Sequence, residues 1–114
     1  MHELSIVFHI IKTIEQVGEE NKLEHVNSVT LEVGEVSAVI DEYLGDCWKW
    51  AADRSGLLKG ARLVIEKLPA VTMCETCERT YATVQYGRIC PYCGSERTYL
   101  LSGREINIKE IEVG

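Results

Sequence analysis

The sequence has little of what membrane proteins and many enzymes depend on. It contains 114 residues, with two prolines and three histidines. No apolar run approaches the roughly 20 residues that a membrane span needs. It holds neither a serine in a nucleophile-elbow pattern nor a glycine-rich phosphate loop. We therefore expect a protein that does not enter the membrane and is not an enzyme.

Basic residues are also scarce. The chain carries 12 Lys and Arg against 18 Asp and Glu, for a net charge of −6. Proteins that bind nucleic acid usually concentrate basic side chains on one face. The cysteine-rich segment offers only spaced arginines: Arg79, Arg88, Arg97 and Arg104. We expect no nucleic-acid partner.

The acidic N-terminus has no basic residues ahead of an apolar stretch, which is unlike a secretory signal. We therefore expect a cytoplasmic protein. Thiols stay reduced in that compartment, so a group of cysteines there usually marks a metal site rather than disulfides.

Four of the five cysteines form two Cys-x-x-Cys hooks, Cys74 with Cys77 and Cys90 with Cys93. Two such hooks can bring four sulfurs to the corners of a tetrahedron, which is the geometry of a structural Zn(II) site. Two disulfides or four ordinary buried thiols are the alternatives. Four thiolates leave no open position for water or substrate, so we expect zinc as a structural cofactor.

The apolar pattern predicts two helices. Over residues 4–17 the i, i+3, i+4, i+7 spacing indicates a helix with a broad buried face that includes Leu4 and Phe8. A second helix is expected over residues 41–53, with Asp41 as its N-cap. Its predicted buried stripe consists of Leu44, Cys47, Trp48 and Ala51, whereas Trp50 is expected to be partly exposed.

Alternating side chains predict one strand over residues 29–33 and a second over residues 62–66, which stops before Pro69. Short strands are expected around 80–86 and 97–101, beside the cysteines. Residues 106–113 alternate again but have no helix of their own, so we expect this strand to return to the first sheet. The predicted fold is α+β: two helices on a small three-stranded sheet with an inserted zinc-ribbon module. The predicted domains are 1–69 plus 105–114, and 70–104.

The first residues offer a second metal site. The terminal amine, a deprotonated backbone amide and the imidazole of His2 could close chelate rings on one ion, and Glu3 could add its amide nitrogen or its carboxylate. Such a nitrogen-rich, flattened donor set suits Ni(II) or Cu(II) better than zinc. Because many chains begin Met-His, this pattern does not by itself decide the function. A metal-dependent hydrolase using His2, Glu3 and His9 is another reading.

Several motifs occur together in one order. They are Met1-His2-Glu3-Leu4-Ser5, Leu31-Glu-Val-Gly-Glu35, Gly60-Ala61 before Leu63-Val-Ile-Glu66, and the cysteine quartet. In this the chain resembles the HypA/HybF family of hydrogenase nickel-incorporation proteins over essentially its full length. The resemblance implies a nickel metallochaperone with a nickel-binding domain and an inserted zinc ribbon. Nickel would be held by His2 and the Glu3 region, as cargo.

The resemblance also implies partners. They are a maturation GTPase of the nickel-insertion pathway and the large subunit of a nickel–iron hydrogenase, with urease as a further recipient in some members. The residues alone leave a zinc-ribbon adaptor that binds protein or nucleic acid as the alternative. A homodimer is compatible with the sequence. Some relatives place histidines beside the zinc cysteines, but this chain has none there, so we do not expect histidine ligands to exchange at the zinc site.

Overall fold

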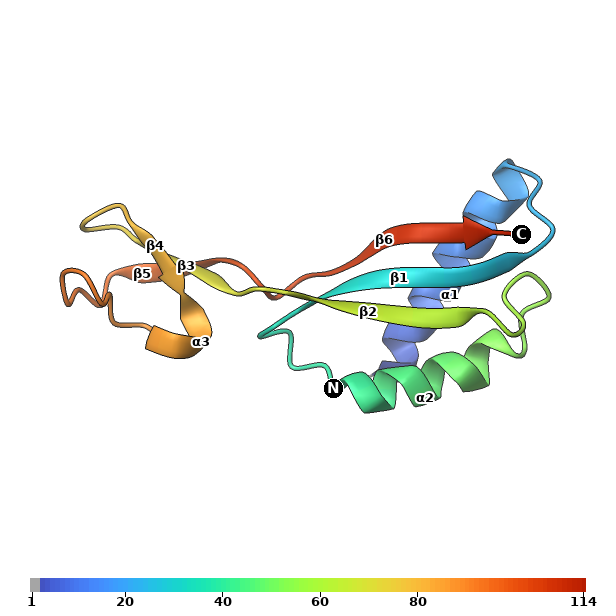
Figure 1. Cartoon of the computed structure of the whole chain (residues 1–114), viewed down its shortest axis with the longest axis horizontal. Helices are drawn as coiled ribbons and strands as arrows, with labels where there is room; N and C mark the ends of the chain where they lie inside the picture. The colour runs from blue at the N-terminus through green and yellow to red at the C-terminus, as the bar shows by residue number, and fades with distance from the viewer. Residues whose placement is uncertain (1–2) are drawn as a thin grey trace. The chain divides into compact units, whose positions relative to one another are not determined.

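The computed structural model describes residues 3–114 (Figure 1). The chain forms two compact units. The first unit contains residues 3–31 together with Val39–Glu66 and Asn107–Gly114. The second, which we call the ribbon unit, contains Glu32–Ala38 and Lys67–Ile106. The predicted functional domains, 1–69 plus 105–114 and 70–104, stay a prediction.

The first unit is built on a three-stranded sheet and two helices. The elements are α1 (Glu3–Glu20), β1 (Val26–Gly34), α2 (Asp41–Ala52), β2 (Arg62–Leu68) and β6 (Ile106–Val113). The strand order is β2-β1-β6. In Figure 1, β1 and β2 run in the same direction, with α2 between them in the chain.

The last strand runs antiparallel to β1. At one end the Gly34 N–H donates to the Glu105 carbonyl at 2.7 Å, and at the other the Gly114 N–H donates to the His25 carbonyl at 3.2 Å. The prediction that this strand returns to the first sheet is therefore confirmed. It places the ribbon sequence between two strands of one sheet.

The core of the first unit is aliphatic. Its fully buried side chains come from α1, β1, α2 and the following loop: Val7, Ile14, Val26, Val29, Leu31, Leu44 and Leu58. Gly18 lies within α1 where the loop between α2 and β2 comes close: a Cβ at this position would lie 2.6 Å from Leu57 Cδ2. The predicted helix thus continues past the glycine to Glu20.

The prediction that Leu4 and Phe8 belong to the core was wrong. Their exposed fractions are 39% and 47%. The other apolar residues of that predicted row, Val7, Ile11 and Ile14, are buried, and their mean direction lies about a fifth of a turn from that of Leu4 and Phe8. Because apolar residues occupy more than half of the circumference of this helix, periodicity alone could not determine which row turns inward.

Helix α2 begins at Asp41, the residue predicted to be its N-cap, and so one residue earlier than predicted. Ile40 occupies the N-cap position with no side-chain cap hydrogen bond, and Asp41 is already helical. Trp48 is buried and its Nε1–H donates to the Ala61 carbonyl at 2.9 Å, whereas Trp50 is half exposed. Both tryptophan predictions are confirmed. Cys47, expected to be buried, is only partly buried.

The ribbon unit contains β3 (Val71–Cys74), β4 (Thr80–Ala82), the short helix α3 (Thr83–Tyr86) and β5 (Thr98–Ser102). Its sheet has the order β4-β3-β5. Both pairings are antiparallel, with Met73 opposite Thr80 on one side and Tyr99 on the other.

The strand predicted over 80–86 is correct only as far as Ala82. After it, the chain closes one helical turn, in which the Gly87 N–H donates to the Thr83 carbonyl at 2.7 Å. Gly87 has a positive φ of 67°, which ends the turn. The β-branched residues Thr83 and Val84 favour a strand, and local turn geometry overrides that preference.

Among residues 3–114, no helix combines the length and the apolar character that a membrane crossing would require.

Candidate metal centre and the N-terminal residues

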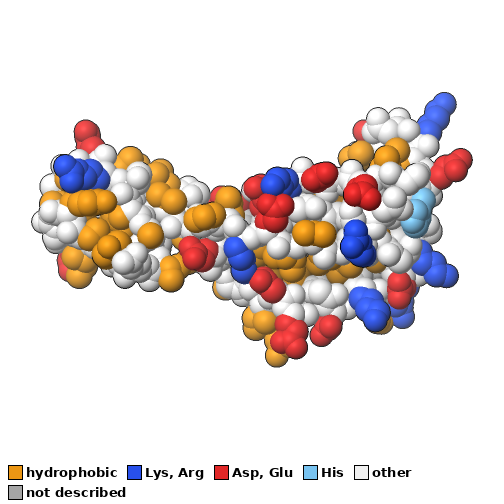
Figure 2. Space-filling model, in the orientation of Figure 1, with side chains coloured by type: hydrophobic (Ala, Val, Ile, Leu, Met, Phe, Trp, Pro, Cys, Tyr) orange, Lys and Arg blue, Asp and Glu red, His pale blue; other side chains and the backbone are white. Residues whose placement is uncertain are grey.

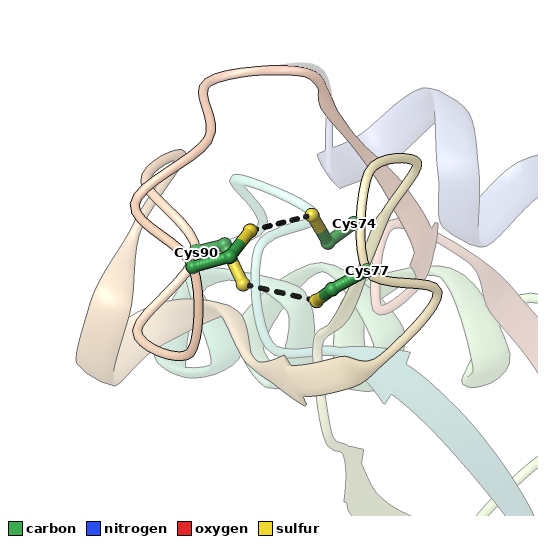
Figure 3. Close-up of side chains that lie close together, drawn as sticks. Cys74, Cys77 and Cys90 are labelled. Carbon is green, nitrogen blue, oxygen red and sulfur yellow. Dashed lines mark hydrogen bonds between the residues drawn. The ribbon is translucent and has the colours of Figure 1, made fainter.

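The four predicted zinc ligands come together in the ribbon unit. The sulfurs of Cys74, Cys77, Cys90 and Cys93 all lie within 4.8 Å of one another. Cys74 Sγ is 3.6 Å from Cys93 Sγ, and Cys77 Sγ is 3.6 Å from Cys90 Sγ (Figure 3). Four thiolates at the zinc–sulfur distance of about 2.3 Å would sit about 3.8 Å apart along the edges of a tetrahedron. The observed separations fit that geometry and are too long for S–S bonds.

Each cysteine hook is folded by the same backbone hydrogen bonds. The Glu78 N–H donates to the Cys74 carbonyl and the Gly94 N–H to the Cys90 carbonyl, both at 2.9 Å. Glu78 and Gly94 occupy equivalent places and have positive φ values of 60° and 74°. The two Cys-x-x-Cys motifs therefore fold into the same type of turn.

Further contacts surround the sulfurs. The hydroxyl of Thr76, inside the first hook, lies 2.8 Å from that of Ser95, two residues after the second hook. Tyr81 packs with Cys74, Cys77 and Cys90 in a small core, and its hydroxyl donates to the Gly87 carbonyl at 2.9 Å. The four sulfurs are therefore held together by local turns and packing as well as by any metal.

The thiols differ in acidity. The Cys77 backbone N–H, opposed by burial and assisted by the Thr76 N–H, lowers the pKa of Cys74 to about 6. Burial raises the pKa of Cys77. At Cys93 the Ser95 N–H favours the thiolate, but burial and the neighbouring thiols outweigh it and raise the pKa to about 12. Cys93 as a whole residue is exposed, but its sulfur lies among the other three sulfurs. The loss of solvent that raises its pKa therefore concerns the sulfur atom.

These pKa values have a consequence for metal binding. Without metal, Cys74 ionises before Cys77 and Cys93, which keep their protons at neutral pH. A metal that binds all four sulfurs must displace those protons, so its affinity falls as the pH falls.

At the other predicted site, Glu3 is the first residue of α1 and is 7% exposed. Its Oε2 accepts a hydrogen bond from the Ile40 N–H at 3.2 Å, which brings the start of α1 to the start of α2. A carboxylate next to a helix N-terminus is also favoured by the helix dipole. Sequence reasoning proposed Glu3 as a ligand and missed this structural role, which no local motif signals.

The other predicted nickel residue, His2, lies outside the described residues. His9 and His25 are both exposed. Cys47 lies on α2 in the first unit and so takes no part in the cysteine cluster of the ribbon unit.

Comparisons with known proteins give a consistent result. The model of a family described as "Hydrogenase/urease nickel incorporation, metallochaperone, hypA" matches residues 1–113. The hydrogenase maturation factor HypA of Azotobacter chroococcum mcd 1 is 39% identical over 113 residues, covering 99% of both chains. The factor of the same name from Geobacter metallireducens (strain ATCC 53774 / DSM 7210 / GS-15) is 36% identical over 113 residues, again covering 99% of both.

A solved structure has the same fold. The solution structure of the Ni metallochaperone HypA from Helicobacter pylori superposes with a TM-score of 0.76 at 24% identity, covering 99% of this chain and 97% of that one. At this level of identity the likeness concerns the fold alone.

Proposed function

Because the chain belongs to the HypA family of hydrogenase and urease nickel-incorporation metallochaperones, we propose that it binds Ni(II) at its N-terminus and delivers the ion during maturation of nickel–iron hydrogenase. The observation that carries this proposal is the match of residues 1–113 to a nickel-incorporation family. The proposed role is delivery, without catalysis.

The nickel donors would be the amine of Met1, the backbone nitrogens that follow it, and the imidazole of His2. The Glu3 carboxylate already accepts the Ile40 N–H, so we expect Glu3 to contribute its backbone nitrogen. Backbone nitrogens bind only when deprotonated, so nickel affinity falls as the pH falls. A site of this kind can be selective for nickel and still release it when a partner displaces one donor.

We assign structural zinc to Cys74, Cys77, Cys90 and Cys93. The sulfur separations of 3.6 Å support this assignment, and the absence of a competing histidine in the segment favours a pure thiolate site. Zinc bound by four thiolates supplies folding free energy and no open coordination position. These four residues would fix the ribbon unit without taking part in nickel transfer.

The proposed partners are a maturation GTPase and the large subunit of nickel–iron hydrogenase, with urease as a second recipient, and the proposed location is the cytoplasm. A zinc-ribbon adaptor is the alternative function. It is favoured by exposed apolar side chains on the ribbon unit, including Val84, Ile89 and Tyr92. An adaptor would be indifferent to nickel and to the identity of residue 2.

Nickel titration of the untagged protein tests the proposal. Calorimetry should show one Ni(II) per chain, with binding strongly weakened by His2→Ala and unchanged zinc content. His9→Ala is the matched control, since His9 is exposed on α1. X-ray absorption should show nitrogen-rich nickel without sulfur. Equal affinity in His2→Ala, or nickel–sulfur scattering, would contradict the N-terminal site.

A further inference from the structure

The first unit exposes two aromatic rings in contact with each other. Phe8 of α1 and Trp50 of α2 meet edge to face, with ring centroids 6.1 Å apart and an interplanar angle of 67°. Phe8 is 47% exposed and Trp50 48%. Large aromatic side chains normally bury most of their surface, so a contacting pair with this much exposure is unusual for a structural role alone.

Three more exposed apolar residues extend the pair along both helices. Leu4 precedes Phe8 by one turn of α1, Tyr43 precedes Trp50 by two turns of α2, and Ile40 lies at the start of α2. The hydrogen bond from Ile40 to Glu3 holds the beginnings of the two helices together. We call Leu4, Phe8, Ile40, Tyr43 and Trp50 the aromatic face.

The rings of the aromatic face are held in place before any partner arrives. The Arg54 guanidinium carbon lies 3.7 Å from the Trp50 ring centroid, and Arg54 Nη1 donates to the Trp50 carbonyl at 2.7 Å. A ring fixed between a cation and a second ring loses little conformational freedom on binding. Tryptophan, tyrosine and arginine are also the residues that contribute most to protein–protein affinity.

At the start of α2, the charged residues beside the aromatic face are all acidic. From Ile40 to Trp48 the charged residues are Asp41, Glu42 and Asp46, all acidic. Over the start of α2, hydrophobic side chains lie next to acidic ones (Figure 2). The basic side chains lie toward the other end of the face: Lys12 one turn after Phe8 on α1, Lys49 on α2, and Arg54 stacked on Trp50.

We propose that the aromatic face docks an amphipathic segment of a partner protein. Apolar side chains of the segment would cover Phe8 and Trp50, and lysine or arginine would lie against Glu42 and Asp46. An anionic membrane or a nucleic acid would be repelled by these carboxylates. The proposal does not depend on nickel, because it follows from exposure, ring geometry and charge.

A defined peptide tests the proposal on the full-length, zinc-loaded chain. The probe is a synthetic amphipathic helix of leucine, alanine and lysine, compared with the same peptide carrying glutamate in place of lysine. NMR should show shifts of the Phe8 ring and the Trp50 indole N–H on adding the lysine peptide. The glutamate peptide should bind markedly more weakly, and the difference should shrink as salt is raised.

Variants localise the binding. Phe8→Ser and Trp50→Ser should each raise Kd by about tenfold or more. The double variant Glu42→Lys/Asp46→Lys, which leaves every apolar side chain in place, should raise Kd several-fold. Its control is Glu110→Lys/Glu112→Lys, the same charge change on exposed positions of β6. Tyr92→Ser is the aromatic control, on the ribbon unit. Both controls should bind as wild type does.

Other results would overturn the proposal. They are the absence of binding, equal affinity for the two peptides, or a Kd unchanged by Trp50→Ser. Self-association that Trp50→Ser abolishes would instead identify a second copy of the chain as the occupant. Nickel binding, measured on the same variants, should stay at the wild-type level, so failure of the docking proposal and failure of the nickel proposal remain distinguishable.

Discussion

The carboxylate of Glu3 accepts a hydrogen bond from the backbone N–H of Ile40, 37 positions further along the chain. Ile40 is the N-cap of α2 and has no cap hydrogen bond from its own side chain. In a capping box a glutamate of the same helix accepts the N-cap N–H. Here a glutamate from another helix does so. The second residue proposed to carry nickel thus also fixes where α2 begins.

Glu3→Ala should therefore destabilise the fold more than it disturbs nickel binding. A hydrogen bond to a largely buried carboxylate contributes about 1.5–3 kcal/mol, so we expect a loss of that order in the free energy of unfolding. Nickel affinity should fall only slightly if Glu3 supplies its backbone nitrogen. Urea unfolding and nickel titration of one preparation measure both quantities. A large loss of nickel affinity with unchanged stability would make the carboxylate a ligand.

Two glycines in the ribbon unit lie too close to neighbouring backbone to be replaced. A Cβ on Gly34 would lie 2.0 Å from the Gly103 carbonyl oxygen, and a Cβ on Gly103 would lie 2.4 Å from Ala70 Cα. Gly103 also has a positive φ of 111°. Backbone cannot move aside as a flexible side chain can.

Gly34→Ala should accordingly lower the free energy of unfolding by about 3 kcal/mol. Gly45→Ala is the matched control: Gly45 lies within α2 with nothing within 4 Å of an added Cβ. The control should gain about 0.5–1 kcal/mol, since glycine inside a helix is unfavourable. Thermal and urea unfolding compare the two. Similar stability of both variants would show that the close approach at Gly34 is absent in solution.

Cys74→Ala should release the metal and unfold the ribbon unit. Structural zinc contributes on the order of 10–16 kcal/mol to small metal-dependent modules, far more than the small core around Tyr81 can supply. Zinc stoichiometry and amide NMR spectra provide the measurement, with Cys47→Ala as the control. Resonances of the first unit should persist, because its core is separate. Full zinc content in Cys74→Ala would exclude the tetrathiolate site.

The carboxylate of Glu105 should titrate below its ordinary range. Its Oε1 accepts hydrogen bonds from the Arg104 N–H at 3.0 Å and the Gly103 N–H at 2.9 Å. The Arg104 N–H first, and then the Gly103 N–H, lower the Glu105 pKa from the ordinary value of 4.5. The stability from this group is therefore present above that value and is lost as the pH falls through the lowered pKa.

Carboxyl-carbon NMR of the intact protein measures that pKa directly. Glu105→Gln should reduce stability at neutral pH, and its difference from wild type should shrink in acid. A titration midpoint at or above 4.5 would contradict the hydrogen-bonded arrangement.

The sequence predicted the structure well wherever a residue type or a hydrophobic period is compatible with only a few structures. Paired Cys-x-x-Cys hooks predicted the cysteine cluster because the chemistry of four thiolates is specific. Strict alternation predicted β1 and β2, and a final strand without a helix predicted its return to the first sheet. The motif order predicted the family that the comparisons then identified.

The tertiary structure decided which residues are buried, or paired, where the sequence offered several equivalent candidates. The circumference of α1 carries more apolar residues than one face can bury, and packing against the rest of the first unit turned Val7 and Ile14 inward and left Leu4 and Phe8 outside. The partner of Glu3 lies 37 positions away, so no local signal could reveal it. Sequence alone determined the chemistry of the cysteines, because it depends on side-chain identity and short spacing. Which polar and apolar groups meet across the fold was decided by long-range packing.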